Sequence, residues 1–562
     1  MRGVMRVQRM SRPASRRGNE RLARSAPRRA RRAAIGGVVA AIAAVGAALA
    51  LSGGSVTVAG ALTNNRTGVA ALTTTFARIE GLSRYRQSDW GYAVLDERSG
   101  RVVAAQNAQK MFDPGSTMKF YAVSAALSRY GSSYRFRTPV YRQGTVAGGV
   151  LSGNLVLVGS GDLTLGLREQ GNGTLYYESL PKVDQSYATT GLPGAVEPPG
   201  NPLAVLNQLA ARVRASGITR VAGNVVIDDR LFTPYGGFPD GLISPIWVNE
   251  NLIDLLVRPG AVGRPASIKW RPMTASYVVD NRVRTVRAKQ STMLNASEQT
   301  PGRIVVSGQI AAGSPPTLTV WEIADPSAFA RTAFIEALQR AGVTVNARAT
   351  GPNPEALLPP RGSYRAADMI GQHVSDKLSQ YVKLIMKVSY NRGADLMTCL
   401  AAVKLGSTAC SQGLVAEVKT AAGLGVSRTS MFPFDGAGSD DQGRTTPAAL
   451  ATFVRRVVAT PYGKTLFQAL PILGRDGTLA NVESKSPAAG HAQVKTGNRV
   501  VGTAAGQLLV LGNSLAGYAH TKSGRRVVFM IAVGNVPIPT PAAFLGVTAD
   551  QARMVVAIQQ DL

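Results

Sequence analysis

Cysteine and histidine are scarce in this sequence, which has two Cys and three His among its 562 residues. Their positions form no recognisable metal-ligand spacing: His373, Cys399, Cys410, His491 and His520. We therefore predict neither a metal site nor a cofactor. The two cysteines have two open interpretations, because an exported protein could oxidise them to a disulfide, whereas two free buried thiols would be equally ordinary.

Acidic residues are also few, since 33 Asp and Glu stand against 63 Lys and Arg and give a formal net charge of +30. That balance suggests nucleic-acid binding, but residues 1–32 alone contain twelve Arg and one Glu, and the rest of the excess is diffuse. There is no zinc-finger spacing and no ribonucleoprotein aromatic motif. We expect no nucleic-acid partner. A diffusely basic body either suits an anionic surface, such as lipid headgroups or cell-wall polymer, or only maintains solubility.

The basic tail of residues 1–32 is followed by an apolar segment, residues 33–53. Its stretch Ala33–Leu51 has no charged residue, and as a helix it would span about 29 Å, enough to cross a bilayer core. The Arg cluster should remain on the cytoplasmic side, which places the body outside the cytoplasm, in the periplasm or at the cell surface. A permanent membrane anchor and a cleaved signal both remain open, so the protein is either membrane-anchored or secreted.

The remainder is too long for one compact core, since domains usually run to about 100–200 residues. Hydrophobic periodicity and turn residues predict helices and strands in alternating regions. The helices are expected at 69–79, 116–131, 203–216, 326–342 and 549–560, with a helix, a break and a second helix around 389–391. The strands are expected at 90–106 (a hairpin), 150–165, 221–232, 258–321, 492–502 and 525–535. The pattern predicts an α/β domain formed by residues 62–136 and 365–562, interrupted by a large β-rich insertion at 137–364.

Three short motifs carry residues suited to nucleophilic catalysis. They are Ser116-Thr117-Met118-Lys119, Ser389-Tyr390-Asn391 and Lys495-Thr496-Gly497. A serine hydroxyl needs an adjacent base, and Lys119 shares a helix face with Ser116. Lys119 can act as that base if desolvation or a second cation such as Lys495 displaces its proton. Ser116 should also begin a helix, where its N–H could help to form an oxyanion hole.

Each motif has a partial duplicate in the chain, so only their order and context make them informative. Ser179-Leu180-Pro181-Lys182 repeats the first pattern, but Pro181 and the loop around it exclude a useful helix. Ser152-Gly153-Asn154 repeats the second pattern at the start of a strand. Of the three selected motifs, the first begins a helix, the second lies in a break between two helices, and the third lies on a strand. Because they must meet around one carbonyl, the chain between Ser116 and Ser389 must leave the catalytic domain and return.

At this point the chain resembles the class C low-molecular-mass penicillin-binding proteins, the D-alanyl-D-alanine carboxypeptidase/endopeptidases. The resemblance extends from about Trp90 to the C-terminus. Besides the three motifs it rests on DPGSTMKF, YRFRTPVY, GNLVLVGSGDLTL, GITRVAGNVVIDDRLF, VNENLIDLLVRPG, FDGAGS and SLAGYAHTKSGRRVVF. It implies a β-lactamase/transpeptidase-like serine hydrolase domain with a second domain inserted in it and a third nested in the second. It also implies peptidoglycan peptides as substrates and β-lactams as covalent inhibitors.

The resemblance also implies a role for each residue of the motifs. Ser116 would be the acylated nucleophile and Lys119 its base. Ser389 would pass a proton to the leaving amine, and Asn391 would bind the substrate amide. Lys495, Thr496 and Gly497 would form the strand that holds the substrate carboxylate. The N–H groups of Ser116 and Asn498 would form the oxyanion hole.

The sequence departs from the family pattern at two places, and a third correspondence is loose. Asn498 stands where the family usually has Thr or Ser, so a hydroxyl contact to the substrate carboxylate is lost, although an amide can still donate. The segment GQLLVLGN after Gly497 is extra and should lengthen the hairpin beside the cleft. Asp240, in Gly237-Phe238-Pro239-Asp240, is aligned with a family aspartate that binds the ammonium of the stem-peptide diamino acid, but such an Asp is also an ordinary turn residue.

We therefore expect a serine DD-peptidase that cleaves D-Ala-D-Ala bonds or D-Ala cross-links. A β-lactamase is one alternative, but no E-x-x-L-N-type segment lies between Ser389 and Lys495. A non-catalytic peptidoglycan-binding or sensor protein on the same fold is another, and the presence of all the reactive side chains argues against it.

Overall fold

The computed structural model describes residues 66–188, 194–237 and 241–562. The chain divides into two compact units, residues 1–67 and 68–562, and almost all described residues belong to the second. The predicted basic tail (1–32), the predicted membrane segment (33–53) and Asp240 lie outside the described residues. Across the described ranges, no helix combines the length and the apolar character that crossing a bilayer requires.

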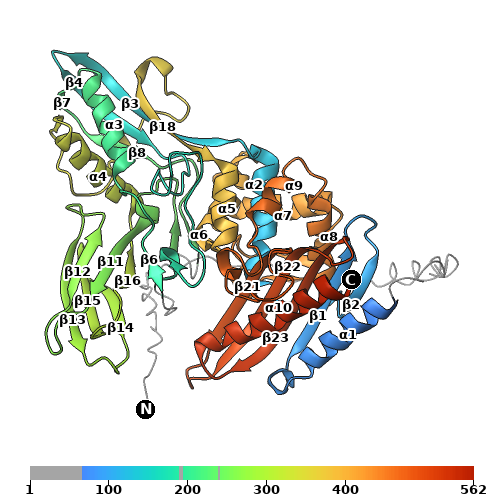
Figure 1. Ribbon diagram of the computed structural model, residues 1–562. Helices are drawn as coiled ribbons and strands as arrows, with labels where there is room; N and C mark the ends of the chain where they lie inside the picture. The colour runs from blue at the N-terminus through green and yellow to red at the C-terminus, as the bar shows by residue number, and fades with distance from the viewer. Residues whose placement is uncertain (1–65, 189–193, 238–240) are drawn as a thin grey trace, which may run out of the picture. The chain divides into compact units, whose positions relative to one another are not determined.

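A five-stranded antiparallel sheet joins segments from the two ends of the 68–562 unit (Figure 1). Trp90 pairs with Val533 in adjacent strands of this sheet. The strand order is β2-β1-β23-β22-β21. Their bounds are β1 Asp89–Asp96, β2 Val102–Gln106, β21 Ala492–Gly502, β22 Leu508–His520 and β23 Arg526–Ile538.

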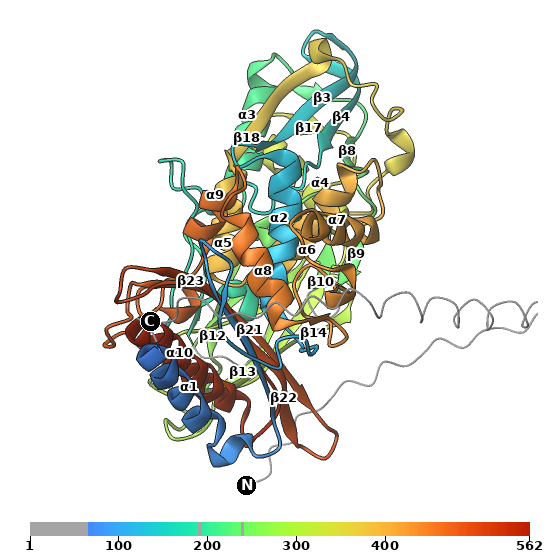
Figure 2. The same cartoon turned by 90° about the vertical axis from the view of Figure 1, so that its right-hand side faces the viewer.

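Alternation along the strands gives this sheet two buried faces, as the pleat of a strand requires. Phe529 and Ile531 belong to a core with helices α1 and α10, which lie side by side on one face (Figure 2). Val528 and Met530 belong to a second core with the helices of the other face. The helices of this part of the chain are α1 Arg66–Glu80, α2 Lys119–Tyr130, α5 Leu378–Lys387, α6 Asn391–Val403, α7 Ser411–Gly423, α8 Pro447–Val457, α9 Gly463–Ala469 and α10 Phe544–Asp561.

The middle of the chain forms further sheets and two helices. A six-stranded sheet packs against α3 Ala204–Ala215 and α4 Pro326–Arg340. Its strands are β3 Arg135–Ala147, β4 Val150–Val158, β7 Arg220–Val221, β8 Val225–Asp228, β17 Thr344–Val345 and β18 Met369–Lys377.

Two three-stranded sheets contain β11 Leu252–Arg258, β12 Ser267–Arg271 and β16 Thr317–Glu322, and β13 Val278–Val286, β14 Met293–Thr300 and β15 Arg303–Ala311. Three small pairs are β5 Val183–Asp184 with β6 Ala195–Val196, β9 Tyr235–Gly237 with β10 Gly241–Ile243, and β19 Met431–Phe432 with β20 Arg444–Thr445.

The strand expected over 150–165 ends earlier than the apolar pattern suggests, at Val158. Gly161 has a φ of +76°, which is incompatible with a continuing strand. The chain therefore turns into the long segment 159–203, part of which reaches the site described next.

Candidate active site

Ser116 and Lys119 lie on either side of a change in helix type. Ser116 belongs to a short 3-10 helix, Gly115–Met118, and α2 begins only at Lys119, whereas the sequence predicts one helix from Ser116. Gly115 has a φ of +49°, so the chain enters the helix through a tight turn. Side chains at i and i+3 eclipse in a 3-10 helix. This stacking places the Nζ of Lys119 2.6 Å from the Oγ of Ser116, to which it donates a hydrogen bond.

The Nζ of Lys119 is buried among three acceptors. Besides Ser116, it donates to Oδ1 of Asn391 at 2.6 Å and to the carbonyl oxygen of Ala437 at 2.8 Å. The Lys119 residue is fully buried. The first and second motifs therefore meet at this one nitrogen, although 272 residues separate Lys119 from Asn391.

The second motif occupies the break between α5 and α6. Ser389 has a φ of +63°, a left-handed conformation that is uncommon for a residue with a side chain. Asn391 begins α6 directly after this turn. The Oγ of Ser389 accepts a hydrogen bond of 2.8 Å from the Nζ of Lys495. Backbone conformations of this kind cluster at functional sites, where the surroundings hold them in place.

The third motif lies on the edge strand β21 of the five-stranded sheet. Lys495 is fully buried, and its Nζ donates to the Thr496 carbonyl at 2.7 Å as well as to Ser389. Burial, together with the nearby charge of Lys119, holds the pKa of Lys495 well below the ordinary lysine value. A lysine in that state can release its proton far more readily than a lysine in water.

Two glycines let β21 approach the 3-10 helix closely enough for their backbones to touch. A Cβ on Gly497 would lie 2.1 Å from the Pro114 carbonyl oxygen and 3.0 Å from the Ser116 nitrogen. A Cβ on Gly115 would lie 2.6 Å from the Asn498 nitrogen. Neither position can accept a side chain without movement of backbone. The amides of Ser116 and Asn498, predicted to form the oxyanion hole, thus belong to two segments in direct contact.

Asn498 has its side-chain oxygen engaged by two donors within the protein. Its Oδ1 accepts hydrogen bonds from Nδ2 of Asn513 at 3.0 Å and from Oγ1 of Thr548 at 3.4 Å. This arrangement leaves the Nδ2 amino group, a donor, as the end of the Asn498 side chain that can meet a substrate carboxylate. The extra segment after the motif extends the β21–β22 hairpin, which pairs as far as Gly502 and Leu508.

A cleft with a volume of about 480 Å³ lies over the three motifs. Of the predicted residues, Ser116, Ser389, Asn391, Thr496 and Asn498 line it, whereas Lys119, Lys495 and Gly497 are buried and do not contribute to its lining. The remaining walls come from the start of α10, from the segment 178–187 and from the loop 438–439. The charged residues that line the cleft are Glu178, Lys182, Asp184, Glu322, Lys387, Arg392 and Arg499.

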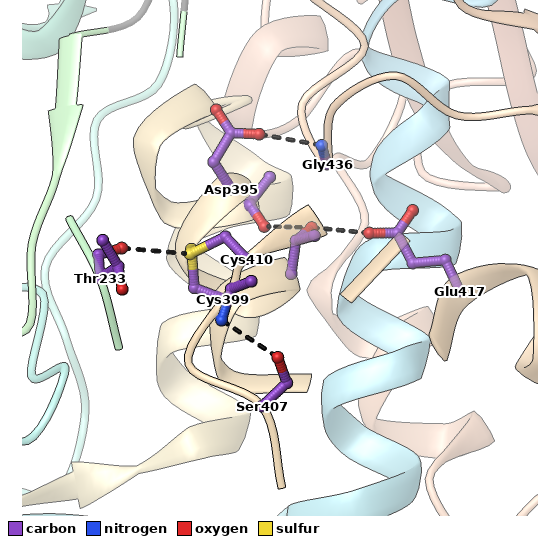
Figure 3. Close-up of a disulfide and its surroundings, with 10 residues drawn as sticks. Thr233, Asp395, Cys399, Ser407, Cys410, Glu417 and Gly436 are labelled. Carbon is purple, nitrogen blue, oxygen red and sulfur yellow. Dashed lines mark hydrogen bonds between the residues drawn. A yellow bond between two sulfur atoms is a disulfide. The ribbon is translucent and has the colours of Figure 1, made fainter. Parts of the chain in front are cut away.

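Three residues at or next to the site have no role in the sequence prediction. Ala437 lies in the FDGAGS segment and receives the Lys119 hydrogen bond, and Oδ1 of Asp395 accepts from the amides of Gly436 and Ala437 (Figure 3). The FDGAGS motif was a signal for this loop. Tyr187 donates to the carbonyl oxygen of Ser389. No signal marked Tyr187, because it lies in a Gly- and Pro-rich segment without periodicity.

The two cysteines form a disulfide that joins α6 to the start of α7 (Figure 3). Cys399 is fully buried, and Cys410 is 5% exposed. Close to the disulfide, Thr398 on α6 donates to Glu417 on α7 at 2.6 Å. These contacts fasten the helix that carries Asn391. Within the described ranges, no group of three or more His, Cys, Asp and Glu side chains is placed to hold a metal ion.

Curated relatives match most of the chain. A D-alanyl-D-alanine carboxypeptidase from Actinomadura sp. (strain R39) is 25% identical over 433 residues, which cover 72% of this chain and 72% of the relative. A D-alanyl-D-alanine carboxypeptidase from Haemophilus influenzae is 20% identical over 417 residues, which cover 70% of this chain and 76% of the relative.

Solved structures match the fold. The crystal structure of penicillin binding protein 4 from Haemophilus influenzae aligns with a TM-score of 0.65 at 18% identity and covers 88% of this chain and 99% of that protein. Its complex with a β-lactam aligns with a TM-score of 0.64 at 19% identity over the same shares of the two chains. This likeness confirms the predicted fold class, an α/β serine hydrolase domain with a large β-rich inserted region.

The family follows from a match over most of the sequence. The sequence profile of the D-Ala-D-Ala carboxypeptidase 3 (S13) family covers residues 77–543. This match and the named relatives confirm the predicted activity, that of a serine DD-peptidase acting on peptidoglycan. The chain therefore belongs to the D-Ala-D-Ala carboxypeptidase 3 (S13) family.

Proposed function

We propose that Ser116 is the acylated nucleophile of this DD-peptidase and that Lys119 is its general base. The observation that carries the proposal is the hydrogen bond of 2.6 Å between a fully buried lysine and a hydroxyl that lines the cleft. A general base must lie within hydrogen-bond reach of the proton it accepts, and the Nζ of Lys119 lies within that reach of the Ser116 hydroxyl.

In acylation, the Oγ of Ser116 attacks the carbonyl carbon of the penultimate D-Ala, and its proton moves to the Nζ of Lys119. The C–N bond then breaks, and the leaving amine takes a proton from the Oγ of Ser389, which Lys495 replaces. Lys119 has then gained one proton and Lys495 has lost one. In deacylation, water supplies OH to the acyl carbon and a proton to Lys495, while Lys119 returns its proton to Ser116. The depressed pKa of Lys495 supports this proton relay.

Substrate binding follows from the donors around the nucleophile. The amides of Ser116 and Asn498 would hold the oxyanion that develops on the carbonyl, and Asn391 would bind the substrate amide. Thr496 and the Nδ2 of Asn498 would hold the terminal carboxylate. Asp240 remains a proposed partner for the ammonium of the diamino acid.

The location and the organisation of the chain complete the proposal. A DD-peptidase acts on the cell wall, which lies outside the cytoplasm. We propose that residues 33–53 direct the rest of the chain out of the cytoplasm, as a membrane anchor or as a signal. We also propose that residues 137–364 form two nested domains within the peptidase domain of 62–136 and 365–562. The separate five-stranded and six-stranded sheets support this division. Strand β3 begins at Arg135, two residues before the proposed insertion, and the whole of β18, Met369–Lys377, follows its end at residue 364 although β18 pairs in the six-stranded sheet.

Labelling with a fluorescent penicillin tests the assignment of the nucleophile. The β-lactam complex of the Haemophilus influenzae protein supports penicillin as the probe. We expect covalent label on the wild-type protein and none on Ser116→Ala. Ser152→Ala, which changes the exposed serine of the duplicate motif Ser152-Gly153-Asn154, should label normally. Undiminished label on Ser116→Ala would refute the assignment.

Turnover separates this function from its alternatives. A DD-peptidase should release D-Ala from a pentapeptide or cleave a D-Ala cross-link, and its penicillin adduct should be long-lived. A β-lactamase would instead hydrolyse the penicillin rapidly. A sensor protein would be labelled without releasing D-Ala.

A further inference from the structure

A tyrosine from the middle of the chain reaches into the cleft and contacts the second motif. Tyr187 is the last residue of a short 3-10 helix, Gln185–Tyr187, and lines the cleft. Its hydroxyl donates a hydrogen bond to the carbonyl oxygen of Ser389 and lies 3.4 Å from the Oδ1 of Asn391. A residue far from every motif in sequence thus contacts both Ser389 and Asn391 of that motif.

The contact falls where the backbone most needs support. Ser389 has a φ of +63°, and such a conformation persists only when surrounding groups hold it. Two groups hold Ser389 from opposite ends: Lys495 donates to its side-chain oxygen, and Tyr187 donates to its backbone oxygen. Without the second bond, the residue could relax toward an ordinary conformation and turn its Oγ away from Lys495.

The short helix that carries Tyr187 is capped by a buried carboxylate. Asp184 caps the 3-10 helix by accepting from the amide of Ser186 at 3.1 Å. Its carboxylate also pairs with Arg168 at 2.8 Å. Arg168 is only 1% exposed and Asp184 is 4% exposed, so water competes little with this ion pair.

A second carboxylate, that of Glu250, connects the Asp184–Arg168 ion pair to α6, the helix that begins at Asn391. Glu250, which is fully buried, accepts from Arg168 at 3.0 Å and from the side-chain Nε2 of Gln185 at 3.1 Å. Its backbone oxygen accepts from Arg392, on α6, at 3.3 Å. Glu250 belongs to the VNENLIDLLVRPG segment, which no step of the proposed reaction uses. The network therefore fixes the 3-10 helix of Tyr187 relative to the helix that begins at Asn391.

We propose that Tyr187 is a positioning residue for catalysis, which holds the Ser389 backbone so that its hydroxyl remains on Lys495 and can pass a proton to the leaving amine. The inference rests on the proposed role of Ser389. Under this proposal the segment 184–187 affects the chemical step. If Tyr187 only formed part of the cleft wall, it would affect substrate binding instead.

Steady-state kinetics of D-Ala release test this inference with four variants. Tyr187→Phe removes only the hydroxyl, and we expect kcat to fall about ten-fold with KM changed less than about two-fold, as for an interaction that matters in the transition state. Ser389→Ala should lower kcat further. In the Ser389→Ala background, Tyr187→Phe should have no additional effect, because the positioned hydroxyl is already absent. Tyr364→Phe, which removes a hydroxyl bonded to Asp228 in the six-stranded sheet, is the matched control and should behave as wild type.

Three results would overturn the inference: a wild-type kcat for Tyr187→Phe, a change in KM alone, or effects of the two substitutions that multiply in the double variant. Penicillin labelling of Ser116 separates these results from failure of the proposed function. If Ser116→Ala abolishes the label and Tyr187→Phe has no kinetic effect, the nucleophile assignment stands and only the positioning role falls. If wild type fails to release D-Ala, the proposed function itself falls.

Discussion

The Nζ of Lys495 donates a hydrogen bond of 2.8 Å to the Oγ of Ser389, and 106 residues separate the two in sequence. The donor is fully buried on the edge strand of the sheet, and the acceptor occupies a left-handed turn between two helices. This bond links the strand that approaches the 3-10 helix of Ser116 to the helix that carries Asn391.

Lys119→Met should lower the rate of acylation by penicillin by about 10²–10⁴-fold, the usual contribution of a general base. The substitution also removes the group that joins Ser116, Asn391 and Ala437. Stopped-flow or gel-based acylation kinetics measure the rate. Lys110→Met, at an exposed position, is the control. A loss smaller than about ten-fold would contradict the role of base.

Gly497→Ala should nearly abolish acylation, because the new Cβ would lie 2.1 Å from a backbone oxygen and would push β21 away from Ser116. Overpacking of this kind costs about 1–3 kcal/mol in stability. Gly502→Ala, at the end of the same strand, meets no atom closer than 3.3 Å and should retain activity. Label incorporation and thermal melting of both variants check the pair. Equal labelling of the two would show that the close approach is dispensable.

Asn498→Asp should raise KM for a pentapeptide by more than about ten-fold, because a carboxylate would replace the donor that faces the terminal carboxylate of the substrate. The value of kcat should change less than KM. Asn295→Asp, which adds the same charge at an exposed position of β14, controls for net charge. An unchanged KM for Asn498→Asp would remove Asn498 from the carboxylate site.

Glu417→Gln should make the protein more stable at alkaline pH. Burial raises the pKa of Glu417 to about 8, above its ordinary value of 4.5. The folded chain therefore holds a proton that the unfolded chain releases, and the stability present below pH 4.5 is lost as pH rises through about 8. Denaturant unfolding at several pH values should show a flatter profile for the variant. The exposed Glu355→Gln is the control, and a profile parallel to wild type would contradict the prediction.

The double substitution Cys399→Ala and Cys410→Ala should destabilise the protein by about 2–3 kcal/mol, the usual effect of releasing a short disulfide loop. The cysteines are 11 residues apart and join α6 to the start of α7. Chemical denaturation under non-reducing conditions measures the difference. An unchanged unfolding midpoint would show that packing of α6 on α7 suffices. Penicillin labelling well below the midpoint should persist, because Lys119 and Asn391 retain their contact.

The chain order of the motifs and their local context were sufficient to predict the family and its fold class. The apolar run within 525–535 predicts a strand, which the structure shows as β23, and the break at Ser389 is visible between two helical patterns. The beginning of α2 was placed three residues too early. Helix propensity does not separate an α-helix from a 3-10 turn, which here follows from the left-handed φ of Gly115.

The sequence by itself determined which side chains could react, because a Ser with a Lys three residues later, a Ser-x-Asn break and a Lys-Thr-Gly strand are local patterns. It left open whether Cys399 and Cys410 pair, and it gave no indication of Tyr187. Only the tertiary structure decided these points, since a disulfide and a hydrogen bond to Ser389 depend on distances between segments far apart in the chain. Local residue patterns determine local geometry, whereas such contacts exist only after the separate cores have packed and brought those segments together.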